Sequence, residues 1–172
     1  DTLVLPKASS VLEIGPGEGD LLPALAERCT RLVALDNSPA MLDIARSKVR
    51  PELNVTFIEG DIHQGVLDGQ YFDVAVANMV LHHTPDPAEI FNDLSKLLTP
   101  GGSLIITELC QHDQSWARKS CGDLWLGFDT EDLSYWAAKA GLWDGKSLHL
   151  TQRNGFQLQL RQFYKPINQQ PI

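Results

Sequence analysis

The segment Val11-Leu-Glu-Ile-Gly-Pro-Gly-Glu-Gly-Asp20 decides the fold, because a short apolar run ends in alternating glycines at positions 15, 17 and 19. Glycine lets the backbone turn sharply and approach a ligand closely, since it has no Cβ. A dinucleotide-binding loop, G-x-G-x-x-G, would need its third glycine at position 20, where this chain has Asp20. The segment therefore predicts a strand followed by a tight turn that suits a different nucleoside-bearing ligand.

The bulk composition excludes several kinds of protein. A chain of 172 residues that is 43% hydrophobic is expected to form one domain with its own core. No apolar run approaches the ~20 residues of a membrane span, so no membrane partner is expected. A net charge of −8 argues against binding of a nucleic acid backbone by this domain itself.

The cysteines and the first residue bear on the cellular compartment and on whether the chain is part of a longer protein. Cys29, Cys110 and Cys121 form no C-x-x-C pair, and their odd number fits reduced thiols in a cytoplasmic protein. The chain begins with Asp1 rather than Met and reaches its first expected strand at Ser10. We therefore expect it to be a piece of a longer protein or a trimmed form of one.

Strands alternate with helices over most of the chain. Apolar runs predict strands at 10–14, 31–36, 54–59, 72–77 and 103–108. Helical spacing and end signals predict helices at 21–28, from Pro39 to about Val49, at 88–98 and at 130–140. In this interpretation Asp20 caps the first helix, Ser38 caps the second, and Thr99-Pro-Gly-Gly102 ends the third. Short βα units predict an α/β, doubly wound fold with a mostly parallel sheet.

The last third of the chain departs from this alternation. Residues 111–126, with Trp116 and Trp125, suggest a short helix and a loop. Two alternating runs, 146–152 and 156–163, flank Arg153-Asn-Gly155, and Asn-Gly between such runs predicts an antiparallel hairpin. The residues from Lys165 onward are expected to form a loose tail.

Further polar residues follow the expected strands. Asp36 ends the second strand, about twenty residues after the first glycine, where an acid can accept hydrogen bonds from ribose hydroxyls. Gly60-Asp61-Ile62 follows the third strand and offers a carboxylate beside an apolar residue, which suits adenine. Asn78 follows the fourth strand. Ligands of open α/β sheets bind at the carboxyl ends of strands, so these residues predict one site.

With these residues in place, the chain resembles the class I S-adenosylmethionine-dependent methyltransferases of the small-molecule type, which include the ubiquinone/menaquinone and biotin-pathway enzymes. The likeness covers about 10–164 and includes Asn78-Met-Val-Leu-His-His83 and Leu98-Thr-Pro-Gly-Gly102. It implies a Rossmann-like seven-stranded sheet of order 3-2-1-4-5-7-6 with strand 7 antiparallel. It also implies a cofactor-binding domain over 1–164, followed by the tail at 165–172.

The resemblance assigns the cofactor and its contacts. The expected cofactor is S-adenosylmethionine, with S-adenosylhomocysteine as the product and no metal. In the family the glycine loop holds the methionine portion, the acid matching Asp36 binds ribose, and the acid matching Asp61 binds the adenine amine. Backbone at the Asn78 position meets the methionine amino group. The expected binding residues are Glu13, Gly15, Gly17, Gly19, Asp36, Asn37, Met41, Gly60, Asp61, Ile62, Asn78 and Met79.

Each main contact also has a plain structural interpretation. Glu13 could pair with a neighbouring cation, although an acid buried against a glycine turn is hard to justify without a ligand. Asp36 could cap the second helix. Asp61 could be a turn residue, and Met41 could belong to the helix core.

The histidines are open to two interpretations. His82 and His83 are adjacent and are expected to diverge, so they form a poor metal pair, and Asp86 does not complete a ligand pattern. A structural role is the first interpretation for these histidines. The alternative is that His83, or His112 beyond the fifth strand, acts as the general base for methyl transfer.

Two functions of different class remain open. As an enzyme, the domain would transfer a methyl group to a small-molecule acceptor. A second resemblance, carried by 106–113, 122–128 and 153–157, is to the methyltransferase-like half of bacterial regulators with an ArsR-type winged helix. It implies a sensor of S-adenosylmethionine or S-adenosylhomocysteine with little or no catalysis, and a homodimer formed through an upstream DNA-binding domain.

Overall fold

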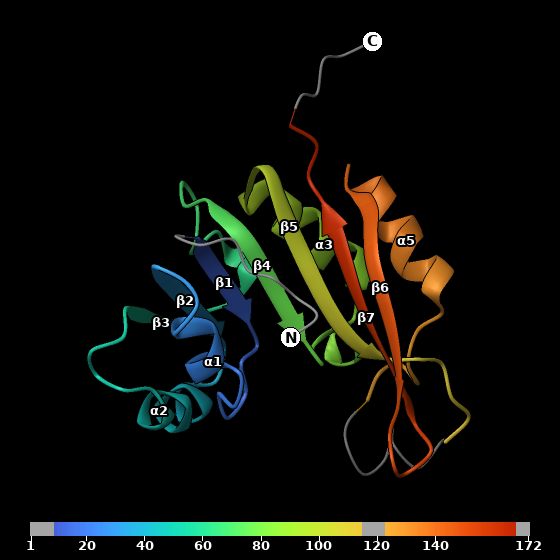
Figure 1. The fold of residues 1–172 in the computed structure, drawn as a ribbon, viewed down its shortest axis with the longest axis horizontal. Coiled ribbons are helices and arrows are strands. Elements are labelled where there is room, and N and C mark those ends of the chain that lie inside the picture. Colours follow the sequence, from blue (N-terminus) through green and yellow to red (C-terminus); the bar gives the residue numbers. More distant parts are fainter. Residues whose placement is uncertain (1–8, 115–122, 168–172) are drawn as a thin grey trace.

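A seven-stranded sheet organises the chain, in a computed structural model that describes residues 9–114 and 123–167 (Figure 1). The strand order is β3-β2-β1-β4-β5-β7-β6, and β7 runs antiparallel to both of its neighbours, as predicted. The strands are β1 (Ser10–Ile14), β2 (Arg31–Asp36), β3 (Val55–Glu59), β4 (Phe72–Asn78), β5 (Leu98–Leu109), β6 (Trp143–Thr151) and β7 (Gln157–Tyr164).

Helices cover both faces of this sheet. They are α1 (Leu22–Ala26), α2 (Pro39–Lys48), α3 (Pro87–Leu97) and α5 (Thr130–Lys139), with the 3₁₀ helices η1 (Ile62–Gln64) and η2 (Leu81–His83). One core cluster joins α3 and α5 to the sheet, and a second joins α1 and α2 to the opposite face. The predicted doubly wound α/β fold is confirmed, and its burial on both faces explains the continuous apolar runs of the parallel strands.

Side chains cap two of the α-helices. Ser38 precedes α2, as predicted, and its Oγ accepts a hydrogen bond from the backbone N–H of Met41 at 3.3 Å. Asp86 precedes α3, and its Oδ1 accepts from the N–H of Glu89 at 3.2 Å. Asp86 is therefore the N-cap of α3.

The predicted cap of the first helix is wrong. Leu21 is the N-cap residue of α1 and makes no side-chain cap, while Asp20 accepts an ion-paired hydrogen bond from Lys48 Nζ at 2.6 Å. The Asp20 carboxylate binds the ammonium group of Lys48, the last residue of α2, and α1 begins at Leu22 with no side-chain hydrogen bond from Asp20. The helix spans five residues, fewer than the expected 21–28.

The fifth strand begins earlier than predicted. Leu98, expected as the last helical residue, and the helix-stopping segment that follows it both lie within β5. Backbone bonds to the segment after β7 hold the glycines there, because Gly101 N–H donates to Lys165 O at 2.9 Å and Lys165 N–H donates to Gly102 O at 2.8 Å. Pairing across the sheet thus extends a strand through residues that local propensity assigns to a loop.

The predicted hairpin is confirmed. Gln152 N–H donates to Phe156 O at 2.8 Å, which places Asn154 and Gly155 in the turn between β6 and β7. Of the expected helix and loop at 111–126, the described residues 111–114 and 123–126 contain no helix. Trp116 and Cys121 lie outside the described residues, as do residues 168–172 of the expected tail.

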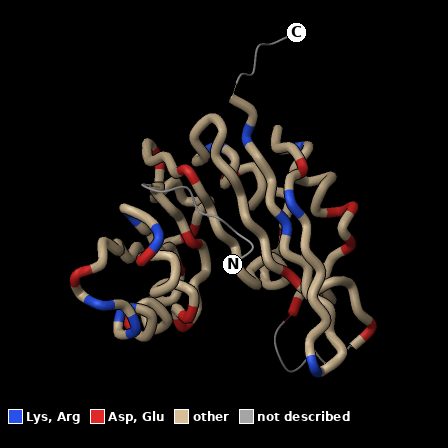
Figure 2. Tube along the Cα trace, in the orientation of Figure 1, with Lys and Arg blue, Asp and Glu red and all other residues tan. Residues whose placement is uncertain are grey.

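Charged residues of both signs are interspersed along the chain (Figure 2). In the described part of the chain, none of the helices combines the length and apolar character that a membrane crossing requires.

We expect truncation of Phe91 to destabilise the fold. Its ring is completely buried on α3 and meets Phe163 of β7 edge-on at 5.5 Å between centroids. Phe91→Ala should lower the free energy of unfolding by about 3–5 kcal/mol through lost burial and a cavity. Urea denaturation measures this. Ile44→Ala on the exposed side of α2 is the control and should change stability by less than about 1 kcal/mol. Equal losses in the two variants would contradict this core assignment.

Candidate cofactor and active site

The predicted cofactor residues gather where the parallel strands end, an edge we call the carboxyl edge. Glu13 lies one residue before the end of β1, Asp36 ends β2, Asp61 follows β3, and Asn78 ends β4. The strands are in register, since Ile14 pairs with both Leu35 and Ala77, and Asp36 pairs with Glu59. The structure therefore brings these segments to one edge of the sheet, as the sequence predicts.

The three glycines of the loop after β1 have different surroundings. A Cβ on Gly19 would lie 2.6 Å from the Cβ of Ala45, so α2 packs directly on this residue. A Cβ on Gly15 would lie 2.8 Å from a methyl group of Val80, just before η2. A Cβ on Gly17 would meet nothing within 4 Å among the described residues, although φ is +54°. Two glycines thus serve protein packing, and Gly17 borders open space.

Glu13 is a buried acid without a partner. It is 1% exposed, and its Oε2 has no hydrogen-bond partner among the described residues. Burial disfavours the charged carboxylate and raises the pKa of Glu13 to about 8. The alternative that Glu13 pairs with a neighbouring protein cation finds no support in the described ion pairs. This carboxyl is protonated in the ligand-free protein below that pH and can become charged when a cation approaches.

Glu13 should therefore make stability depend on pH. Its folded-state pKa lies above its ordinary value of 4.5, so the folded state holds the proton more tightly. The contribution of Glu13 to the free energy of unfolding is complete below pH 4.5 and is lost as pH rises through about 8. Glu13→Gln should flatten this decline and stabilise the ligand-free protein at pH 8.5, by on the order of a few kcal/mol.

Thermal unfolding of both proteins between pH 5 and pH 9 measures the effect. The matched control is Glu52→Gln, which changes an exposed acid. An unchanged pH dependence in Glu13→Gln would show that this carboxyl does not titrate in that range.

Asp36, Asn37 and Met41 surround the start of α2. Asp36 is half-buried, and its Oδ1 accepts a hydrogen bond from Ser38 N–H at 2.9 Å. Ser38, not Asp36, is the N-cap residue of α2. Met41 is half-buried in the first turn and Asn37 is exposed. The bond to Ser38 fixes the orientation of the Asp36 carboxylate at the carboxyl edge.

Asp61 acts as the N-cap of η1. Its Oδ1 accepts from His63 N–H at 3.0 Å, and the Gln64 side chain accepts from Asp61 N–H at 3.4 Å. Gly60 before it has a φ of +155°, and Ile62 after it packs against the main core cluster. The turn interpretation of Asp61 is thus present in the structure, and a carboxylate has further acceptor capacity for a ligand.

The end of β4 has an unusual backbone. Asn78 is half-buried and pairs with Thr107 of β5. Met79 follows with a φ of +58°, the one described residue other than glycine with positive φ. Such a conformation costs about 1–3 kcal/mol and tends to occur at ligand sites. A backbone bond from Met79 N–H to Thr107 O at 2.9 Å holds it there.

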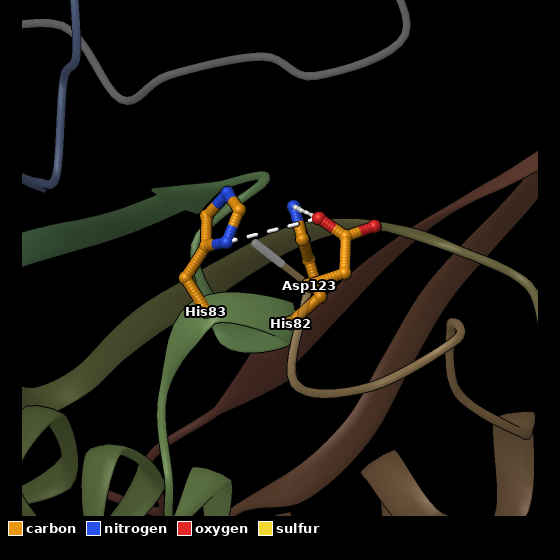
Figure 3. A group of neighbouring side chains, drawn as sticks. All are labelled: His82, His83 and Asp123. Atoms are coloured by element: carbon orange, nitrogen blue, oxygen red, sulfur yellow. Dashed lines mark ion pairs between the residues drawn. The ribbon is translucent and has the colours of Figure 1, made fainter. Parts of the chain in front are cut away.

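The prediction that His82 and His83 diverge is wrong. Both lie in η2, their ring centroids are 4.0 Å apart, and both face the carboxylate of Asp123 (Figure 3). His82 Nε2 and His83 Nδ1 each lie 3.8 Å from Asp123 Oδ1. Adjacent residues of a 3₁₀ helix project about 120° apart, so the two long side chains meet through the orientation of their rings and not through the backbone. We call these three residues the His–His–Asp cluster.

Glu108 adds a second acid behind His82. It is fully buried at the end of β5, and His82 Nδ1 lies 2.9 Å from its Oε2. Burial lowers the pKa of His82, but the hydrogen bond to Glu108 and the charges of Glu108 and Asp123 outweigh it, so the pKa is raised above its usual value. Alternation with Leu104 and Ile106 could have revealed that Glu108 faces inward. Asp123 gave no such signal, because its segment has no periodic pattern.

His112 lies apart from the predicted cofactor residues. Its Nε2 is buried with no partner among the described residues, and its ring meets Phe156 edge-on at 4.9 Å between centroids. It lines a cavity of about 770 Å³ between the end of β5 and the β6–β7 hairpin, together with Cys110 and Asn154. None of the predicted cofactor residues lines this cavity.

Comparisons with known proteins agree with this geometry. Residues 12–106 match the family model of the methyltransferase domain. A ubiquinone biosynthesis O-methyltransferase of Coxiella burnetii is 31% identical over 104 residues, which is 60% of this chain and 44% of that protein. The chain thus aligns with less than half of the length of that curated relative.

Solved structures share the fold over most of the chain. The N-methyltransferase NodS of Bradyrhizobium japonicum WM9, in complex with S-adenosyl-L-homocysteine, superposes with a TM-score of 0.78 at 24% identity and covers 92% of this chain and 79% of NodS. The [4+2]-cyclase SpnF superposes with a TM-score of 0.81 at 18% identity, over 96% of this chain and 77% of SpnF. At these identities the likeness concerns the fold.

Proposed function

The chain belongs to the methyltransferase domain family, and from this premise we propose that it binds S-adenosylmethionine at the carboxyl edge and transfers the methyl group to a small-molecule acceptor. The observation that carries the proposal is the buried carboxyl of Glu13, which has no hydrogen-bond partner among the described residues and stands four residues before Gly17, a glycine with open surroundings. A buried acid without a partner is costly, and a cationic ligand would offset that cost.

The residues at the edge suit the parts of such a cofactor. Gly17 leaves room for a ligand to approach the backbone, and Glu13 can balance positive charge on the methionine portion. Asp36 presents a fixed carboxylate to ribose hydroxyls. Asp61 retains acceptor capacity for an exocyclic amine, with Ile62 beside it for the adenine face. Asn78 and Met79 present backbone groups next to β1.

The bound cofactor supplies a methyl group activated by the adjacent sulfonium. The chain's own residues then have to hold the acceptor in line with that group and exclude water. His83 is half-exposed in η2 beside the glycine loop, so we propose it over His112 as the group that takes a proton from the acceptor.

The relatives support catalysis over the sensor alternative. The curated relative and NodS are both named methyltransferases. SpnF has the same fold and is named a cyclase, so the fold by itself does not specify methyl transfer. We further propose that residues 1–164 form the functional domain, that 165–172 form a tail, and that the protein acts in the cytoplasm.

Calorimetric titration tests cofactor binding. The domain should bind both S-adenosylmethionine and S-adenosylhomocysteine. Asp36→Ala should weaken both by about 10- to 100-fold, because a charge-assisted hydrogen bond is lost. Gly17→Val should weaken binding at least as much, because its side chain enters the open space. Asp43→Ala, an exposed acid of α2, is the control and should bind normally. No binding of either compound by the wild type would refute the proposal.

Turnover separates the enzyme from the sensor. Incubation with S-adenosylmethionine and a phenol, an amine or a thiol should release S-adenosylhomocysteine with at least one acceptor class, and Asp36→Ala should release less at subsaturating cofactor. Binding without any release in the presence of all three classes would favour the sensor.

A further inference from the structure

We propose that His82, His83 and Asp123 form a binding site for a divalent transition-metal ion of the zinc type, with Glu108 orienting His82. This site does not rest on the proposed function, but it shares His83 with it: when Nδ1 of His83 holds the ion its lone pair is occupied, so His83 can take the acceptor proton only in the metal-free form. It departs from the expectation that the domain holds no metal.

The spacing of the three side chains fits a shared ion better than direct hydrogen bonds. His82 Nε2 and His83 Nδ1 are each 3.8 Å from Asp123 Oδ1, beyond hydrogen-bond range. The ligand atoms of the cluster all lie within 4.8 Å of one another. Tetrahedral zinc with bonds near 2.0–2.1 Å places its ligands about 3.3 Å apart. The two 3.8 Å separations would therefore shorten by about 0.5 Å, and the two histidine nitrogens, which lie within 4.8 Å of each other, would move by at most about 1.5 Å.

Glu108 supplies the outer contact that metal-binding histidines usually have. His82 Nδ1 lies 2.9 Å from Glu108 Oε2, and the His82 backbone N–H also donates to Glu108 Oε1 at 3.3 Å. In the neutral imidazole, donation of Nδ1–H to this carboxylate leaves the lone pair on Nε2, which faces Asp123. A carboxylate behind a ligating imidazole fixes its tautomer and orientation.

Asp123 is buried and held in place. It is 7% exposed, and its carboxylate accepts no hydrogen bond from the described residues. The backbone N–H groups of Leu124 and Trp125 donate to His82 O at 2.8 and 3.2 Å. The indole N–H of Trp125 donates to Thr84 O at 2.9 Å. These bonds fasten the residues after Asp123 to η2, so the cluster is preorganised while the carboxylate accepts no hydrogen bond from the described residues and faces the two imidazoles at 3.8 Å.

His83 leaves the site accessible. Its side chain is 49% exposed, in contrast to the 7% of His82. Three protein ligands with solvent access on one side are typical of zinc sites that keep a coordination position open for water or another ligand. Val80, three residues before His83, covers Gly15, so η2 itself lies next to the glycine loop.

A second group of potential ligands provides the matched control. His63, Glu89 and Asp93 also gather their ligand atoms, but His63 Nδ1 already lies 2.6 Å from Asp93 Oδ2. That is a direct hydrogen bond on the exposed surface, with no room for an ion between the two atoms. We therefore expect no contribution of His63 to metal affinity.

The test uses EDTA-treated, dialysed protein titrated with Zn²⁺ by calorimetry and with Co²⁺ by visible absorption. Wild type should bind one ion per chain, and the Co²⁺ form should show the d–d bands of a four- or five-coordinate site. His83→Ala and Asp123→Asn should weaken Zn²⁺ binding by more than tenfold, and Glu108→Gln by about 10- to 100-fold. His63→Ala should bind as wild type does.

Several results would overturn the proposal. They are failure of wild type to bind either ion, equal affinity in His83→Ala, loss of affinity in His63→Ala, or a Co²⁺–thiolate charge-transfer band that assigns the ion to cysteine. Because Asp123 and Glu108 are buried, circular dichroism must show that their variants fold. The half-exposed His83→Ala variant decides the question if they do not.

Discussion

Close approach of the glycine loop to its neighbours is the constraint on which the carboxyl edge depends. At Gly19 the backbone touches α2, and at Gly15 it lies under Val80, so neither position has room for a side chain. These two contacts fix the loop between α2 and η2. Gly17 then faces open space, and the position of that space is set by the packing on either side of it.

The same edge contains two buried acids that differ in their hydrogen bonding. Glu13 has no hydrogen-bond partner in the part of the chain that the structure describes, and its pKa is raised to about 8, so a cationic ligand would stabilise its charged form. Glu108 has a partner in His82 and positions that imidazole toward Asp123. One acid is thus suited to a ligand and the other to orienting a side chain. Met79, with its strained backbone, follows β4, the strand that lies between β1 with Glu13 and β5 with Glu108.

The apolar runs and the glycine spacing, which are local signals, predicted the strands and the segments of the carboxyl edge, whereas the sheet order was implied by the resemblance to class I methyltransferases. The local signals failed where a tertiary contact overrode local preference. Leu98 and Pro100 belong to β5 because the segment after β7 pairs with Gly101 and Gly102. Asp20 pairs with Lys48 instead of capping α1. Asp123 could not be placed near His83, because only the folded chain brings these distant segments together.

If S-adenosylmethionine binds at the carboxyl edge as proposed, Glu13 becomes charged when it binds. Calorimetric titration at pH 7 in buffers of different ionisation enthalpy counts the protons exchanged on binding. We expect net release of a proton by the wild type, since Glu13 is protonated before binding, and loss of that release in Glu13→Gln. Equal proton release in both proteins, or none in the wild type, would contradict this expectation.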